Sequence, residues 1–163
     1  MELSDIEKAM NLISEIEFKT VGLYQHWAEK RGISFELMIL LYSLVANDNI
    51  TQKKIATTYR MPKQTVFSLV RNLQNQGFVE LIQSETDKRE KVIHLTHEGE
   101  SYCFEVIRPL TEINKNVGKR IGLDFTCKLL EDLKVYCRSI EMAMELAEVS
   151  DKWENMIEHI QTD

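Results

Sequence analysis

Residues 62–77, with the sequence PKQTVFSLVRNLQNQG, place side chains that could bind anions and base edges on one face of a helix. At helical spacing one side carries Val66, Leu69, Val70 and Leu73. The opposite side carries Lys63, Gln64, Phe67, Ser68 and Arg71. Gln can pair with an adenine edge through two hydrogen bonds, and Arg or Lys can pair with guanine. The pattern indicates a helix that reads DNA, although an ordinary amphipathic surface helix has the same alternation.

A second stretch, DKREKVIHLT at residues 87–96, begins with charged residues and then turns apolar. By itself such a run is typical of a solvated loop. However, Asp87 and Arg89 come directly before a predicted strand, and a predicted helix starts after that strand. This position distinguishes the run from an isolated charged loop.

The distribution of charge favours an anionic partner for the middle of the chain. The 163 residues have a net charge of −6. Residues 51–96 nevertheless hold eight Lys or Arg against four Asp or Glu, which is a balance of +4, so the remainder carries −10. A basic middle between acidic ends is the electrostatic footprint expected for DNA, with the ends serving another purpose.

Hydrophobic periodicity and capping residues predict the elements around these stretches. The order is a long helix from residue 3 to about 30, a very apolar helix, a short helix, the helix of residues 62–77, a hairpin and two long helices. The hairpin strands are FVELIQS and KVIHL. The last two helices are expected at about residues 98–117 and 125–149. The expected helix starts and stops are Gly32, Ser34, Thr51, Pro62, Gly77, Thr96 and Asp124.

A short helix, a tight turn and a second helix outline a helix-turn-helix, and a hairpin after it would be a wing. Residues 50–82, followed by residues 87–99, resemble the winged helix-turn-helix of the MarR (multiple antibiotic resistance regulator) family. The family's wing signature is matched by Asp87, Arg89, Leu95, Thr96 and Gly99. In helix order the resemblance covers nearly the whole chain.

The resemblance implies a homodimeric regulator of transcription that binds a pseudo-palindromic operator. It implies that Arg89 enters the minor groove and that Asp87 orients it. A narrow minor groove has an enhanced negative potential, which favours an inserted guanidinium. Lys88 and Lys91 would contact phosphates, which adds affinity without sequence information. The complete set of expected DNA-binding residues is Arg89, Asp87, Lys88, Lys91, Lys63, Gln64, Phe67, Ser68, Arg71, Arg60, Thr65 and Lys53.

Three positions depart from the family pattern. Arg60 stands where the family often has glycine in the turn, and Pro62 stands where it often has a serine cap. Arg60 could add a phosphate contact. Phe67 occupies a position that is usually small or polar, so it either touches an apolar group of the DNA, such as a thymine methyl, or folds back onto the protein.

The ends of the chain are expected to form the dimer, since in this family the first helix and the last two interlace. One candidate surface is the apolar stripe from Leu3 to Trp27, and the other comprises Leu129, Leu130, Leu133, Tyr136, Ile140 and Met144. The alternative for each residue is a place in the core of its own chain. The resemblance also implies a small-molecule switch, with a pocket expected at Tyr24, Trp27, Phe35, Met38, Tyr42 and Phe104.

Other chemistry has less support in the sequence. Cys103, Cys127 and Cys137 lack CxxC spacing and are expected to be reduced interior thiols of a cytoplasmic protein. His94 and His97 could hold a metal, but no carboxylate or thiol cluster completes a site. Neither a phosphate-binding glycine loop nor a hydrolase motif is present, so no enzyme and no cofactor are expected.

These observations predict a mainly α fold with a small β-hairpin wing, namely a winged helix-turn-helix with dimerisation helices at both ends. The expected divisions are residues 1–30, a DNA-binding lobe at 31–99, and residues 100–163. The expected function is sequence-specific binding of double-stranded DNA by a homodimeric repressor that a small ligand releases from its operator. Three alternatives are a winged-helix module that binds another protein, a metal-responsive regulator and a redox-responsive regulator of the same fold.

Overall fold

The structure is a computed structural model that describes residues 3–47, 49–85 and 87–161, without the side chains of residue 3 and residues 150–161. The helices are α1 (Leu3–Glu29), α2 (Phe35–Ala46), α3 (Gln52–Thr58), α4 (Lys63–Asn75), α5 (His97–Ile121) and α6 (Leu123–Gln161). The strands are β1 (Ile50–Thr51), β2 (Val79–Gln83) and β3 (Lys91–Leu95). This order confirms the predicted fold class, a mainly helical chain with a winged helix-turn-helix.

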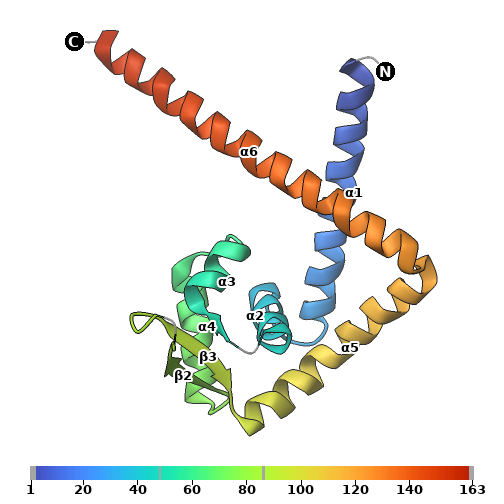
Figure 1. Cartoon of the computed structure of the whole chain (residues 1–163), viewed down its shortest axis with the longest axis vertical. Helices are drawn as coiled ribbons and strands as arrows, with labels where there is room; N and C mark the ends of the chain where they lie inside the picture. The colour runs from blue at the N-terminus through green and yellow to red at the C-terminus, as the bar shows by residue number, and fades with distance from the viewer. Residues whose placement is uncertain (1–2, 48, 86, 162–163) are drawn as a thin grey trace. The chain divides into compact units, whose positions relative to one another are not determined.

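The three strands form one antiparallel sheet in the order β1-β3-β2. Leu81 and Ile50 both pair with Ile93, which is 1% exposed at the centre of the sheet. Periodicity predicted β2 and β3 but missed β1. Two residues are too short to show an alternating pattern, and only the pairing with β3 makes them a strand. In Figure 1 the helices α2, α3 and α4 gather beside this sheet.

The core of the lobe lies where α2 and α4 pack against the other elements. α2 contributes Leu40 and Leu41, both fully buried, as its nearly continuous apolar sequence predicts. Ser34 caps α2, because its hydroxyl accepts a hydrogen bond from the backbone N–H of Leu37 at 3.1 Å. Thr51 caps α3 in the same way by accepting from Lys54 at 3.1 Å. Both predicted caps are therefore confirmed.

Thr96 and Gly99 fix the point where the wing joins α5. The Thr96 hydroxyl accepts a hydrogen bond from the N–H of Gly99 at 3.0 Å and donates one to the carbonyl of Gly77 at 2.6 Å. Gly99 lies against the backbone of Phe78, where a Cβ atom would stand 1.8 Å from the carbonyl oxygen. Beside this contact the rings of Phe78 and Tyr102 stack with centroids 4.4 Å apart. Glycine is thus required at position 99 by packing.

Several predicted helix limits were wrong. Pro62 is the residue before α4 rather than its first residue. α6 begins at Leu123, so Asp124 lies inside the first turn instead of capping it. Gly122, with φ of 84°, makes the reversal that precedes α6, and such a φ favours glycine. α5 continues through Gly118 to Ile121, past the predicted end at residue 117. α6 continues past residue 149, because no proline or glycine follows Gly122 in the sequence.

The chain divides into two compact units, Met1–Leu110 and Thr111–Asp163. The division falls within α5, one residue after Pro109, which has no backbone N–H to donate within the helix. The three predicted divisions, at residues 1–30, 31–99 and 100–163, remain a proposal about function. Among the described residues no helix combines the length and apolarity that a membrane span needs.

Candidate nucleic-acid interface

α4 presents one polar and exposed face. Its opposite face is buried, with Val66, Val70 and Leu73 no more than 2% exposed, so the helix is held firmly by the core. The side chains exposed on the outer face are Lys63, Gln64, Phe67, Ser68 and Arg71, as predicted. Thr65 is half-buried at the edge of this face. Because the core holds the buried face of α4, the exposed side chains stand on a helix whose position is already fixed.

Backbone and side-chain hydrogen bonds hold the turn between β2 and β3. The N–H of Glu90 donates to the carbonyl of Asp87, and the N–H of Ser84 donates to the carbonyl of Glu90, both at 3.0 Å. The Gln83 amide donates to the carbonyl of Lys88 at 2.7 Å. These contacts shape the tip on which Lys88 and Arg89 stand exposed.

Asp87 acts on Arg89 through the backbone. Its Oδ1 accepts a hydrogen bond from the N–H of Arg89 at 2.9 Å. The N–H of Asp87 in turn donates to the Ser84 hydroxyl at 3.3 Å. The carboxylate therefore sets the conformation of the turn beneath the exposed arginine. The expectation that Asp87 holds the guanidinium itself stays a prediction.

Glu90 joins the wing to α3, a role that sequence reasoning missed. Its Oε1 lies 3.0 Å from Nζ of Lys53. The hydrogen bond and charge of Glu90 raise the pKa of the Lys53 ammonium. The partners are 37 residues apart in the sequence, so no local pattern could have revealed the pair. Lys53, an expected DNA-binding residue, is thus partly neutralised by an acid from the wing.

Known proteins have the same arrangement of a helix-turn-helix followed by a β-hairpin wing. A family model described as MarR family matches residues 32–90. The chain is similar to the structure of a MarR family regulator, NMB1585, from Neisseria meningitidis, with 26% identity and a TM-score of 0.67 over 89% of this chain and 98% of that one. Residues 32–90 therefore match the MarR family, and the fold of the chain is that of a MarR family regulator.

Two curated proteins that resemble this chain are named as regulators of the helix-turn-helix type. It is 29% identical over 98 residues, 60% of its length, to YybA from Bacillus subtilis, named an uncharacterised HTH-type transcriptional regulator. It is 29% identical over 97 residues, 59% of its length, to the HTH-type transcriptional regulator Hpr from Exiguobacterium sibiricum. The matches span 59% and 51% of these relatives' own lengths.

A protein–DNA complex has the same fold. The structure of S. aureus MepR bound to DNA resembles this chain with a TM-score of 0.58 and 22% identity, over 80% of this chain and 96% of that one. At this identity the likeness concerns the fold alone. It supports the assignment of residues 50–99 as a winged helix-turn-helix.

Arg60 makes the turn before α4 in the left-handed region of the backbone. Its φ is 50°, the one positive value for a residue other than glycine among the described residues. The family's frequent glycine would adopt this conformation at lower cost. The side chain is exposed on the same lobe as α4 and the wing. The expected contact of Arg60 to phosphate stays a prediction.

The residues expected to line a ligand pocket lie in different environments. Met38 is buried in the core, Tyr24, Trp27 and Phe35 are half-buried, and Tyr42 and Phe104 are exposed. A hollow of about 310 Å³ lies nearby, lined by Arg31, Ile33, Tyr102, Glu105 and Val106. The Arg31 guanidinium stacks 3.9 Å over the Trp27 ring. The buried indole N–H of Trp27 has no hydrogen-bond partner.

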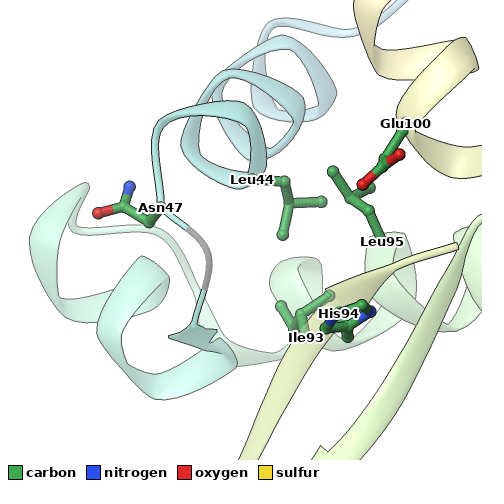
Figure 2. A pocket seen from close by; sticks show the side chains of 6 residues that line it. All are labelled: Leu44, Asn47, Ile93, His94, Leu95 and Glu100. Carbon is green, nitrogen blue, oxygen red and sulfur yellow. The ribbon is translucent and has the colours of Figure 1, made fainter. Parts of the chain in front are cut away.

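A smaller hollow of about 180 Å³ lies between α2, β3 and the start of α5. Figure 2 shows its lining residues, with Leu44 toward the centre and Asn47 apart from the others near the end of α2. His94 and Glu100 are its titratable groups. Among the described residues, no three His, Cys, Asp or Glu side chains gather as a metal site would require.

The cysteines differ in exposure, which corrects the expectation of interior thiols. Cys103 is 1% exposed, and burial raises its pKa to about 11. Cys127 and Cys137 are exposed on α6. The sequence could not show whether Cys127 and Cys137 are buried or exposed, because α6 has apolar residues on more than one side and therefore no single predicted buried face.

Proposed function

We propose that the chain is a sequence-specific regulator of transcription that binds double-stranded DNA as a homodimer. The observation that carries this proposal is the joint placement of α4 and the wing on one lobe. α4 exposes Gln64 and Arg71, the wing exposes Arg89, and the Lys53–Glu90 contact ties the wing to the helix-turn-helix. A major-groove reader and a minor-groove arginine on one scaffold can bind adjacent grooves of one duplex.

The dimer is supported by apolar side chains that one chain leaves exposed. On α1, Ile6, Ile13 and Val21 are 38–45% exposed. On α6, Leu129, Leu130 and Leu133 are 39–53% exposed. Exposed apolar surface of this extent is typical of an interface. We assign both sets to contacts with a second copy, which would present two recognition helices about one turn of DNA apart. The side chain of Leu3, also expected here, lies outside the described residues.

A small ligand would act by favouring an arrangement of the two DNA-binding lobes that does not fit the operator. The hollow between the α1–α2 turn and α5, which is lined by Arg31, Ile33, Tyr102, Glu105 and Val106, supports an effector site. The direction of regulation is proposed as repression that the ligand relieves.

The test of DNA binding uses Arg89→Ala and the dependence of affinity on salt. The wild type should enrich a preferred duplex from a random pool, and its affinity should fall steeply as salt rises, because bound cations release counterions. Arg89→Ala should lose about tenfold or more in affinity for that duplex, while its thermal unfolding is unchanged. Glu98→Gln, an exposed acid on α5, serves as the control variant.

Two outcomes would contradict the proposal. A protein that enriches no duplex, and whose duplex affinity is insensitive to salt, would favour a winged-helix module that binds another protein. Equal affinities of the wild type and Arg89→Ala for the preferred duplex would remove the role assigned to the wing.

A further inference from the structure

Phe67 stands exposed at the centre of the outer face of α4. It is 51% exposed, so it does not fold back onto the core. Its neighbours one turn away along the helix are Gln64 and Arg71, which are also exposed. A single exposed aromatic side chain is common on protein surfaces. Phe67 differs from such a residue because it lines a hollow together with two lysines.

Phe67 lines a hollow of about 300 Å³ together with Gln52, Lys53 and Lys63. The hollow thus has an aromatic wall from α4 and two cationic groups at its rim. Lys53 is held at the rim by its 3.0 Å contact with Glu90 of the wing. The two lysines can bind anionic groups of a ligand, and the phenyl ring of Phe67 can contact an apolar group of the same ligand.

DNA offers one such apolar point at its base edges. In the major groove only thymine presents a methyl group, and the other edge groups are hydrogen-bond donors and acceptors. The phenyl ring of Phe67 has no hydrogen-bonding group, so against a polar edge it would remove water without replacing its hydrogen bonds. Against a methyl group it would bury apolar surface on both partners.

We infer that the hollow beside Phe67 receives the 5-methyl group of a thymine, with Lys53 and Lys63 on the flanking phosphates. This inference rests on the proposed function and deepens it by naming one base that the protein reads. Phe67 is then a specificity-determining residue, whereas Lys63 contributes affinity for any sequence.

The experiment removes the methyl group and the ring independently. The probe is the duplex that the wild type enriches from a random pool, prepared once with thymine and once with uracil at every thymine position. Uracil keeps the Watson–Crick pairing and lacks only the methyl. Wild-type affinity should fall about fourfold for each half-site, as expected for loss of one buried methyl group.

Phe67→Ala should bind the two duplexes equally, and Phe67→Leu should recover part of the preference for thymine. Lys63→Ala, which alters another wall of the same hollow, should weaken binding to both duplexes by the same factor. Single uracil substitutions should then locate the thymine that is read. Thermal unfolding of each variant verifies that its fold is retained.

Equal binding of the wild type to both duplexes would overturn the inference, as would a Phe67→Ala variant that still prefers thymine. If Phe67→Ala lowers affinity for both duplexes by the same factor relative to the wild type, the hollow contacts the sugar–phosphate backbone instead. In each of these cases enrichment of a duplex and the loss caused by Arg89→Ala would leave the proposed function standing. If no duplex is enriched, both fail.

Discussion

At the scale of single residues, the charges of the wing tip have separate roles. Arg89 and Lys88 are exposed and available to DNA. Asp87 instead accepts the N–H of Arg89 and shapes the turn, while Glu90 contacts Lys53 of α3 at 3.0 Å. The acids of this run therefore act within the protein, and its cations face outward. An exposed pair such as Lys53–Glu90 adds little to stability, so its effect is expected on binding.

Replacing Glu90 by Gln should raise affinity for duplexes of any sequence. The variant keeps the size of the side chain but removes the charge that partly neutralises Lys53, so the Lys53 ammonium can act on phosphate with its full charge. At low salt we expect a gain of about threefold to tenfold and a salt slope steeper by about 1. The ratio of specific to non-specific affinity should fall.

Two variants control this prediction. In Glu90→Gln combined with Lys53→Met the gain should vanish, because the ammonium group that Glu90 partly neutralises is absent. Glu80→Gln removes another exposed acid, on β2, and should have a smaller effect. An equal gain from Glu80→Gln would mean that net charge alone, rather than the pair, controls affinity.

At the scale of elements, the connection from α4 through the hairpin to α5 sets the position of the wing. Gly77 ends α4 with a φ of 75°, and its carbonyl accepts the Thr96 hydroxyl across the base of the hairpin. The N–H of Thr96 donates to the carbonyl of Phe78 at 3.1 Å, and Gly99 packs on the same segment. Two residues of the wing signature are thus explained by contacts within the protein, Thr96 by its hydrogen bonds and Gly99 by its packing.

Gly99→Ala should destabilise the fold, since its Cβ would stand 1.8 Å from the carbonyl oxygen of Phe78. The backbone must move to relieve this overlap, at a cost of about 3 kcal/mol in the free energy of unfolding. Urea unfolding at fixed protein concentration measures the change.

Gly118→Ala is the matched control on the same helix. A Cβ at Gly118 meets nothing within 4 Å, so alanine should stabilise by about 0.5–1 kcal/mol through its higher helix propensity. Equal effects of the two substitutions would show that helix propensity, and not contact with Phe78, decides the result at position 99.

At the scale of the whole molecule, the unit Thr111–Asp163 has too little core of its own. None of its described side chains is buried, and many of its apolar side chains are exposed. A long helix that exposes apolar residues is stable in water only when another surface covers them. A second copy of the chain is the partner that we propose.

Leu133→Lys should dissociate the proposed dimer. Leu133 is 50% exposed and shares the spacing of Leu129, Ile140 and Met144 on α6. A lysine within an apolar interface leaves an unpaired charge there, so sedimentation equilibrium should show a shift toward monomer. Affinity for the operator should fall with it, because a monomer presents only one recognition helix.

Val135→Lys is the control, since Val135 is 66% exposed and lies on another side of α6. This variant should remain dimeric. A wild type that stays monomeric at the concentrations where it binds DNA would contradict the proposed assembly. Dissociation by Val135→Lys but not by Leu133→Lys would assign the interface to the other side of the helix.

Local physical rules determined much of this protein from the sequence. Ser34, Thr51 and Thr96 cap helices because a short side-chain oxygen can reach a backbone N–H within the next three residues. The apolar spacing of α4 predicted its buried face, and therefore also its exposed face, correctly. Fold class and the candidate DNA-reading residues followed from such short-range patterns together with the wing signature.

Only the tertiary structure decided the features that join distant residues. β1 exists because Ile50 pairs with Ile93, Gly99 is required because Phe78 lies against it, and Lys53 meets Glu90 across 37 residues. The hollow beside Phe67 likewise needs α3 and α4 to lie together. Each depends on which surfaces the packed core brings together, and that information is absent from the spacing of residues along one helix or strand.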